Sequence, residues 1–362
     1  MNLENLIKLS LVPRVGQAKI RKLISKFETP ENVFNASIQD LIQIEGIEKA
    51  TAEKILSFDS DKFLEKQISS LEKTGAEAIH FWHSDYPQLL KEIHSPPLIL
   101  YVLGKLPTLK EIPIAVVGTR APTVYGKFVT EKIVNELVER NCTIVSGFAR
   151  GIDSISHRCT VAKEAKTVAV LGSGLDVIYP SENKDLVDKV LFNGGAIVSE
   201  FPFGTRPDSR NFPIRNRIVS GMSLGVVVVE AGIKSGAKIT ADIALEQGKE
   251  VFAIPGPINS PKSAGTNQLI QNGAKLTTGI EDIVQELEFY FNVDAKEKQT
   301  SLLPQLLPEE ESFVSSLEPN GTHIDKIAEI TKIPVFRCLT IALALELKGI
   351  VKQYPGKFFI KS

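Results

Sequence analysis

Cysteine is scarce in this chain of 362 residues, and long apolar runs are absent. The three cysteines, Cys142, Cys159 and Cys338, stand far apart. Such spacing predicts neither a disulfide framework nor a CxxC metal pair, and it suits a reducing cytoplasm. The apolar run from Leu224 to Ala231 is too short to span a membrane, and residues 1–11 lack the basic and apolar regions of a secretion signal. We therefore expect a cytoplasmic protein without a membrane partner.

An excess of charge of either sign is also missing. Lysine and arginine total 42 and aspartate and glutamate total 43, so that the formal net charge is −1. A protein that binds nucleic acid without an overall positive charge must gather its basic residues locally. The distribution of charge along the chain is therefore more informative than the sum.

The chain divides into regions by its residue patterns, and its length allows one large core and one or two small ones. We expect three domains and a linker. These are a helical region at 1–75, a region of alternating strands and helices at 76–290, a polar linker at 291–308 and a short third unit at 309–362.

The first region carries two similar turn signals. Val12–Gly16 and Ile44–Ile47 each place apolar residues and a glycine before an amphipathic helical stretch. This is the pattern of a helix-hairpin-helix, whose turn presents backbone N–H groups to a phosphate. A small helical domain with ordinary glycine turns fits the pattern equally well. The sequence therefore predicts a helix-hairpin-helix-like domain and leaves its contact with DNA open.

The central region contains six apolar, β-branched runs with helical stretches between them. Strands that are continuously apolar are covered on both faces, which is typical of a parallel α/β sheet. We therefore predict an α/β fold with a Rossmann-like parallel sheet. The predicted strands are Ile114–Val117, Thr143–Val145, Val168–Leu171, Ala196–Val198, Val226–Val229 and Val251–Ile254.

The last region has the pattern of a winged helix. Three helical signals, the last from Pro334 to Leu347, are followed by two short apolar runs that flank Pro355-Gly356. The presumed recognition helix carries Arg337 but is otherwise mostly leucine, isoleucine and alanine. A major-groove reader needs several polar or basic side chains. We therefore expect this unit to contact protein, and weak DNA binding by it stays open.

Glycines and small hydroxyl residues gather where the predicted strands end. Ligands of an open parallel sheet bind past the carboxyl ends of its strands. There a glycine lets the backbone approach a ligand, and the next helix N-terminus offers free N–H groups to an anion. Several such turns at one sheet edge predict a phosphate site. The positions are Gly118, Thr119 and Arg120, then Ser146 and Gly147, then Gly172, Ser173 and Gly174.

No cofactor fingerprint completes this edge. Gly172-Ser173-Gly174 is the best GxGxxG candidate, but Val177 occupies the third glycine position and the motif follows the third predicted strand. The stretch from Gly232 to Lys238 resembles a P-loop only loosely, because no lysine follows Gly236 directly. We therefore expect no cofactor.

One stretch of the central region mixes arginines with aromatic residues. Residues 201–217 contain Arg206, Arg210, Arg215 and Arg217 together with Phe203 and Phe212. Arginine pairs bidentately with phosphate, and an aromatic ring stacks on an unpaired base. The mixture favours binding of a single strand, to which Lys238 would add a further cation. The alternative is that the last two arginines are held in ion pairs by Glu200 or Glu230.

Catalytic arrangements are poor. His157 is a single histidine on a predicted helix, Asp153 suits a helix cap, and Glu230 suits a structural hydrogen-bond partner at a strand end. No nucleophile and base form an evident pair, and no metal-ligand spacing joins the acidic residues. We expect neither a catalytic nor a metal site, and we predict that the protein is not an enzyme.

Six motifs of the central region occur together in a recognisable order. They are Gly-Thr-Arg at 118–120, Ser-Gly-x-Ala-x-Gly-Ile-Asp at 146–153, Leu-Gly-Ser-Gly-Leu-Asp-Val-Ile-Tyr-Pro at 171–180, Phe-Pro-Ile-Arg-Asn-Arg at 212–217, Val-Glu-Ala with Ser-Gly-Ala-Lys-Ile-Thr-Ala at 229–241, and Val-Phe-Ala-Ile-Pro-Gly at 251–256. In this combination and order they resemble the DNA-processing protein A family, also called Smf.

The resemblance implies a role and a set of contacts. It implies a protein that protects incoming single-stranded DNA, loads a RecA-type recombinase during natural transformation, and forms a homodimer through the Rossmann-like domain. It also implies that Arg120 grips phosphate, that Arg210 is the family's basic residue just before the Phe-Pro-x-Arg-Asn-Arg motif, and that Lys184 is the family's lysine after the Tyr-Pro motif. The candidate DNA- and phosphate-binding residues are therefore Gly118, Thr119, Arg120, Ser146, Gly147, Gly172, Ser173, Gly174, Lys184, Arg210, Phe212, Arg215, Asn216, Arg217 and Lys238.

Two other functions remain open. A nucleotide-acting hydrolase on the related fold would use the same edge glycines together with Glu230, and it would turn over free nucleotides. A scaffold with a purely structural core would leave the isolated central domain without affinity for DNA.

Overall fold

The computed structural model describes residues 2–59, 61–108, 111–291, 307–318, 321–347, 350–354 and 356–361. They belong to two units, Met1–Tyr290 and Phe291–Ser362. The larger unit holds both the helical region and the sheet, whereas most of the expected linker at 291–308 lies outside the described residues. No helix in the described ranges is long and apolar enough to cross a membrane.

The N-terminal region is helical, as its apolar spacing predicts. Its helices are α1 (Leu3–Leu11), α2 (Gln17–Phe27), α3 (Pro30–Phe34), α4 (Ile38–Ile42), α5 (Lys49–Leu56) and α6 (Asp61–Thr74). In α2, Ile20, Leu23 and Ile24 recur on one face and are buried. In α5, Ala52 and Ile55 are buried in the same way. Each of the two turn signals therefore leads into an amphipathic helix.

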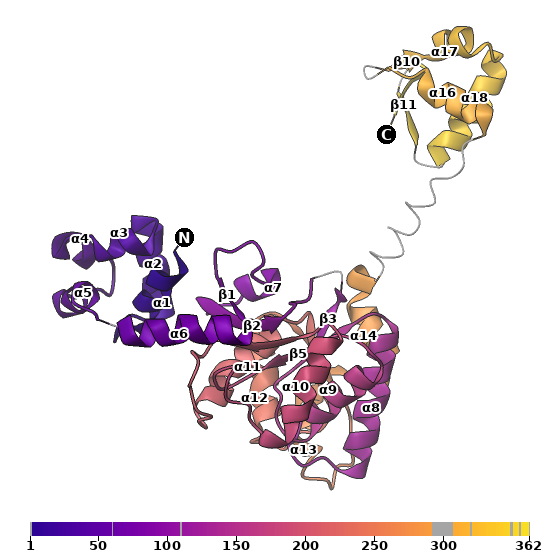
Figure 1. Cartoon of the computed structure of the whole chain (residues 1–362). Coiled ribbons are helices and arrows are strands. Elements are labelled where there is room, and N and C mark those ends of the chain that lie inside the picture. The colour runs from indigo at the N-terminus through magenta and orange to yellow at the C-terminus, as the bar shows by residue number, and fades with distance from the viewer. Residues whose placement is uncertain are drawn as a thin grey trace. The chain divides into compact units, whose positions relative to one another are not determined.

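A mostly parallel sheet, nine-stranded in the described residues, is the centre of the larger unit (Figure 1). Its strands are β1 (Glu77–His80), β2 (Ile99–Gly104), β3 (Pro113–Val117), β4 (Thr143–Ser146), β5 (Thr167–Val170), β6 (Ala196–Ser199), β7 (Gly225–Val228), β8 (Glu250–Ala253) and β9 (Lys275–Leu276). Their order is β1-β2-β6-β5-β4-β3-β7-β8-β9. The six predicted strands are confirmed as β3 to β8, which pair in parallel.

Three further strands extend the sheet beyond the prediction. β1 and β2 form an antiparallel edge, in which β2 also pairs antiparallel with β6. At the other edge β9 has only two residues. β1 mixes exposed and buried positions, and β9 is very short, so neither β1 nor β9 gives a continuous apolar signal.

Helices connect the parallel strands, and the chain changes direction across the sheet at β3. β4 lies on one side of β3 and β7 on the other. Such a reversal leaves a crevice at the carboxyl ends of the two strands. The helices are α7 (Gln88–Lys91), α8 (Val124–Glu139), α9 (Ile152–Ala162), α10 (Lys184–Phe192), α11 (Asn211–Gly221), α12 (Gly236–Glu246), α13 (Ala264–Gln271) and α14 (Ile280–Glu286).

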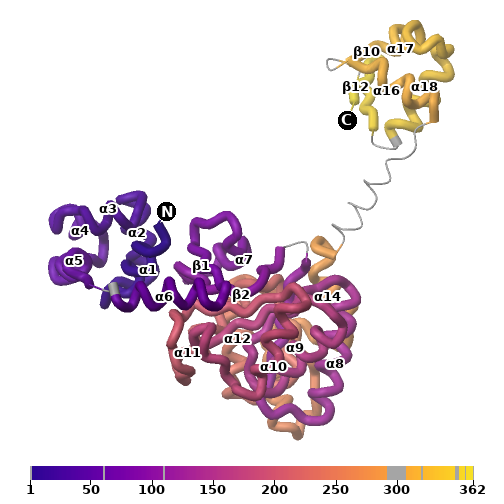
Figure 2. The backbone as a smooth tube through the Cα atoms, in the orientation of Figure 1, coloured from indigo at the N-terminus to yellow at the C-terminus, as the bar shows by residue number. Residues whose placement is uncertain are grey.

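One apolar core joins the N-terminal helices to the sheet. Its buried members include Leu6 and Leu71 from the helical region and Tyr101, Ile197 and Phe203 from the sheet region. In Figure 2 the α6 tube runs beside β2, which carries Tyr101. The helical region is therefore packed on the sheet as part of the same unit.

The smaller unit is a winged helix, as expected. Its elements are α16 (Pro308–Ser315), β10 (Thr322–His323), α17 (Ile324–Thr331), α18 (Val335–Leu347), β11 (Val351–Tyr354) and β12 (Phe358–Lys361). Phe313, Ile327, Leu345 and Phe359 belong to its core. The two strands of the predicted hairpin, β11 and β12, pair antiparallel, whereas Pro355 of the expected turn lies outside the described residues.

The helix α18 keeps an apolar surface. Phe336 is 72% exposed and Leu343 is 60% exposed. Arg337, the one arginine of the helix, donates from Nε to Glu309 at 3.1 Å within the same unit. The exposed face therefore offers little positive charge to a DNA groove.

Candidate nucleic-acid interface

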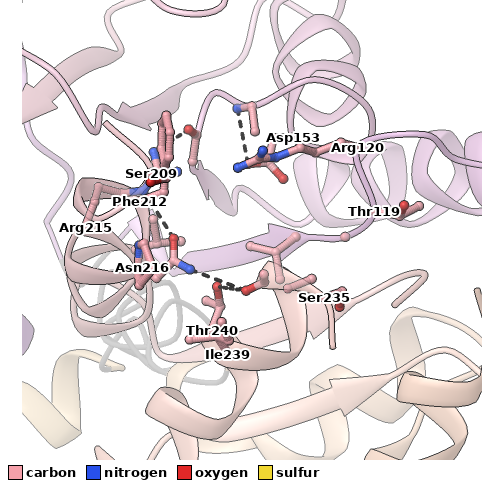
Figure 3. Close-up of a pocket in the computed structure, with 18 of the residues that line it drawn as sticks. Thr119, Arg120, Asp153, Ser209, Phe212, Arg215, Asn216, Ser235, Ile239 and Thr240 are labelled. Carbon is pink, nitrogen blue, oxygen red and sulfur yellow. Dashed lines mark hydrogen bonds between the residues drawn. The ribbon is translucent and has the colours of Figure 1, made fainter. Parts of the chain in front are cut away.

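A pocket of about 720 Å³ opens at the carboxyl edge of the sheet, where β3 neighbours β7 (Figure 3). The turns after β3 and β4 and the first turns of α11 and α12 line it. Open α/β sheets bind their ligands at this topological position. Seven of the predicted site residues line the pocket, namely Gly118, Thr119, Arg120, Gly147, Phe212, Arg215 and Asn216.

Arg120 and Phe212 form the rim of this pocket. Arg120 is exposed, and its guanidinium carbon lies 5.3 Å from the centre of the Phe212 ring. That ring packs on Gly172, where a Cβ atom would stand only 2.8 Å from Phe212 Cδ1. Asn211 donates from Nδ2 to the Gly172 carbonyl at 3.2 Å, which fixes the start of α11 on the same turn. The absence of a side chain at Gly172 therefore places the ring.

The stack continues beyond Phe212. The Tyr179 ring centre lies 5.8 Å from that of Phe212, and the guanidinium carbon of Arg150 lies 5.8 Å from the Tyr179 ring. Arg120, Phe212, Tyr179 and Arg150 thus alternate cations and rings along the edge, and we call these four residues the stacking row. Bases stack on such aromatic faces, and guanidinium groups both stack and pair with phosphate. Sequence reasoning missed Tyr179 and Arg150, although both lie within the motifs of the central region.

Arg215, a predicted DNA- or phosphate-binding residue, is buried at the base of the pocket and makes internal hydrogen bonds. Only 3% of the residue is exposed, and its Nη1 donates to the backbone carbonyls of Gly147 and Val170. Burial lowers the pKa of its guanidinium to about 10, against the opposing effect of Asp153. The side chain therefore joins the ends of β4 and β5 beneath the pocket.

Asp153 lies in the wall of the pocket rather than capping a helix. The N-cap of α9 is Gly151, and Asp153 Oδ2 accepts from the Ala149 backbone N–H at 3.3 Å. Burial raises the pKa of the Asp153 carboxyl, and the Arg215 guanidinium opposes that rise. Figure 3 shows Asp153 with Arg120 on one side of the pocket and α11 on another.

The arginine-rich stretch separates into an exposed and an internal part. Arg206 and Arg210 lie on the loop before α11 and are exposed, the Arg210 side chain by 84%. Asp208 accepts from Arg210 Nη2 at 2.9 Å. Hydrogen bonds from the Arg210 side chain and backbone lower the pKa of Asp208 to about 2. Arg210 therefore keeps an exposed guanidinium beside the pocket, with one exchangeable partner.

Two other predicted cations are already in ion pairs. Arg217 pairs with the largely buried Glu200, which is the alternative that the sequence left open for this arginine. Lys238 pairs with Asp242 at 3.0 Å along α12. Both are less available to phosphate than expected. Lys184 is exposed at the start of α10 and does not line the pocket.

The predicted serines and the remaining glycine support neighbouring turns. Ser146 donates from Oγ to the Val116 carbonyl at 2.7 Å, and Ser173 donates to the Val177 carbonyl at 2.7 Å. Gly174 donates its backbone N–H to the Thr205 carbonyl at 3.0 Å. These hydrogen bonds stabilise the turns at the sheet edge, and both serine hydroxyls donate to backbone carbonyls of the protein.

The groups considered for catalysis have structural partners. His157 is buried and lies 2.7 Å from the Thr167 hydroxyl through Nδ1. Glu230 accepts from the backbone N–H and the hydroxyl of Thr123, at 2.9 and 2.5 Å. The structural interpretations of His157 and Glu230 are confirmed. Within the described residues, no group of three potential metal ligands occurs.

Comparison with known proteins identifies the family. A family model described as DNA recombination-mediator protein A matches residues 77–288.

The chain belongs to the DNA recombination-mediator protein A family.

Two more models match the flanking regions, a SAM-like helix-hairpin-helix tandem at 4–58 and a DprA winged helix domain at 297–357.

Relatives in this family match most of the chain. Protein Smf of Escherichia coli strain K12 is 39% identical over 327 residues, which is 88% of this chain and 86% of that protein. DNA processing protein DprA of Streptococcus pneumoniae is 45% identical over 204 residues, which is 56% of this chain and 72% of that protein.

Solved structures agree with the family assignment. The X-ray structure of DNA processing protein A from Streptococcus pneumoniae has a TM-score of 0.69 at 36% identity, and the match covers 79% of this chain and 99% of that chain. A structure of the Helicobacter pylori protein, reported for its single-stranded DNA binding mode, has a TM-score of 0.52 at 31% identity. That match covers 59% of this chain and 95% of that one.

Proposed function

We propose that this protein binds single-stranded DNA at the carboxyl edge of its sheet, with bases on the stacking row and phosphates on the flanking cations. The observation that carries the proposal is the alternation of guanidinium groups and rings in Arg120, Phe212, Tyr179 and Arg150. A duplex hides the faces of its bases, whereas a single strand exposes them for stacking. The Helicobacter pylori relative, with its reported single-stranded DNA binding mode, supports the same ligand.

The exposed cations near the pocket suit a phosphate backbone. Arg120 is exposed at the rim, and Arg210 makes its described ion pair only with the neighbouring Asp208. A surface ion pair of this kind contributes little free energy, so Arg210 exchanges a carboxylate for a phosphate at small cost. Phosphate contacts supply affinity without reading sequence, which predicts binding that tolerates any base order.

Family membership supports a wider role for the protein. In this proposal the bound single strand is protected and then passed to a RecA-type recombinase during natural transformation. The protein acts as a cytoplasmic homodimer that joins through the sheet domain, and it catalyses no reaction. The winged helix, with its apolar α18 surface, contacts protein rather than a DNA groove.

Substitutions in the stacking row test the proposal. Binding of a labelled single-stranded oligonucleotide to full-length Arg120→Ala and Phe212→Ala is measured by fluorescence anisotropy across a salt series. Removal of one stacked base weakens binding by about 1–3 kcal/mol. Removal of one phosphate-binding cation lowers the slope of log K against log salt by about 0.7. Phe212→Ala should therefore lose affinity with little change of the salt slope. Arg120→Ala should lose affinity and also show a shallower salt slope.

A matched control uses an arginine away from the pocket. Arg140 pairs with Glu281 at 2.7 Å and does not line the pocket. Arg140→Ala removes the same charge, and it should keep wild-type affinity. Equal binding by wild type, Arg120→Ala and Phe212→Ala would exclude this edge as the DNA site.

Nucleotide hydrolysis is the second candidate, and Asp153 is the observation that keeps it open. Glu230, on which that hypothesis relied, is held by Thr123. Asp153 is a buried carboxyl in the pocket with a raised pKa, which is a feature that active sites share. Turnover of any member of a nucleotide panel by the wild type, and its loss in Asp153→Asn, would establish hydrolysis. Absence of turnover, together with DNA binding, would exclude nucleotide hydrolysis as the function.

A further inference from the structure

A glutamine of the helical region holds the backbone of the sheet domain. Gln67 lies on α6 and is fully buried. Its Nε2 donates to the Phe203 carbonyl at 3.2 Å, and its Oε1 accepts from the Phe203 N–H at 2.9 Å. Buried backbone groups require partners, and here one side-chain amide satisfies both groups of one residue. These two hydrogen bonds fix the backbone of Phe203 in the way that a neighbouring β-strand would.

Phe203 lies in a tight turn that the glycine-rich edge holds from its other side. Thr205 donates its N–H to the Pro202 carbonyl at 3.1 Å, and Gly204 has a φ of +85°, which favours glycine. The Gly204 N–H donates to Asp176 Oδ1 at 2.8 Å. The turn Pro202–Thr205 is therefore held between α6 and the loop that follows β5.

The segment that follows this turn carries the exposed arginines of the DNA site. Pro207 and Ser209 line the pocket, and Arg206 and Arg210 are exposed. The side chain of Arg210 has its described ion pair with Asp208 inside the segment itself. The segment is therefore positioned by its two ends, which are the turn held by Gln67 and the start of α11.

We propose that Gln67 is a positioning residue for DNA binding, which fixes the turn Pro202–Thr205 and through it the arginines of residues 206–210 at the rim of the pocket. The inference rests on the proposed function. It gives the helical region a role in affinity that needs no contact between Gln67 and DNA. A preorganised loop binds without the cost of ordering it, so loosening the turn weakens binding.

The test uses Gln67→Met in the full chain, because methionine keeps the length of the side chain and removes both hydrogen bonds. We expect single-stranded DNA to bind about fivefold to tenfold more weakly, with a salt slope that is shallower by about 0.7 for each phosphate that the arginines no longer bind. Gln43→Met is the matched control, since the exposed side chain of Gln43 in the same region has only Lys26 as its described partner. The control should bind like wild type.

Coupling to the arginines of the segment distinguishes positioning from a general loss of stability. If Gln67 acts through the segment, Gln67→Met should cost little further affinity in an Arg206→Ala/Arg210→Ala background. An equal fold-loss in both backgrounds, or wild-type affinity of Gln67→Met, would overturn the inference.

Gln67→Glu adds a pH-dependent readout of the two hydrogen bonds to Phe203. Burial raises the pKa of a carboxyl, and its neutral form can donate to the Phe203 carbonyl and accept from the Phe203 N–H. Its affinity relative to wild type at the same pH should therefore recover as the pH falls. A pH-independent deficit would contradict a role of these hydrogen bonds in DNA binding.

Trypsin cleavage without DNA separates this inference from the proposed function. Gln67→Met should be cut faster than wild type after Arg210, as mapped by mass spectrometry. Faster cleavage, with no DNA binding by wild type, would refute the proposed function and leave the fixing of the turn intact. Unchanged cleavage in a folded Gln67→Met would refute the fixing of the turn.

Discussion

Gly147→Ala should destabilise the larger unit by distorting the buried base of the pocket. An added Cβ would lie 2.6 Å from Arg215 Nη2, 2.8 Å from Arg215 Cζ and 2.8 Å from Asp153 Oδ2. Both neighbours are buried, and Arg215 donates to the Gly147 carbonyl itself, so neither can move aside freely. Overpacking costs about 1–3 kcal/mol, and a weakened hydrogen bond from a charged group costs about 1.5–3 kcal/mol. We expect a total of about 3 kcal/mol.

Thermal unfolding of the full chain measures this loss. For a unit of this size, about 1 kcal/mol lowers the Tm by roughly 2 °C, so Gly147→Ala should melt about 6 °C below wild type. Gly236→Ala is the matched control, because no atom lies within 4 Å of an added Cβ in the same pocket wall. It should melt within about 1 °C of wild type. Equal Tm values for Gly147→Ala and Gly236→Ala would refute the packing argument.

Three further predictions concern the buried groups and the row. Burial lowers the pKa of His157 to about 3. Below about pH 6.5 this histidine is protonated in the unfolded chain but still neutral in the folded one. The free energy of unfolding therefore decreases as the pH falls from about 6.5 toward 3. In urea unfolding, the free energy of unfolding of wild type should fall by about 1 kcal/mol more between about pH 7.5 and about pH 5.5 than that of His157→Gln. Arg217→Ala should lower the free energy of unfolding by about 3–5 kcal/mol, since it leaves Glu200 buried without its partner. Adding Glu200→Gln to Arg217→Ala should restore part of the lost stability in the same assay. Tyr179→Ala should weaken single-stranded binding in anisotropy by about 1–3 kcal/mol, whereas Tyr179→Phe should bind like wild type.

The parallel core was predictable because its signal is local. Each of the strands β3 to β8 contains a short apolar run, and glycines follow the ends of several of them. The position of the pocket followed from these two patterns and the rule for open sheets. The antiparallel edge of β1 and β2 depends on pairing with distant β6, which no local pattern reveals.

The roles of individual arginines were harder to predict, because they depend on which way a helix faces. Arg215 and Arg217 stand two residues apart on α11, and the first donates to carbonyls beneath the pocket while the second pairs with Glu200. Composition alone gave both the same role. Gln67 carries no motif at all, since its importance arises from contact with Phe203, 136 residues away.

Comparative titration of single- and double-stranded DNA tests the central claim most directly. Labelled oligonucleotides of equal length and sequence are titrated with the full chain, and anisotropy is recorded across a salt series. Base stacking on exposed rings predicts salt-sensitive, sequence-tolerant binding that is at least about tenfold tighter for the single strand. Equal affinity for the two forms, or the absence of binding at low salt, would contradict the account.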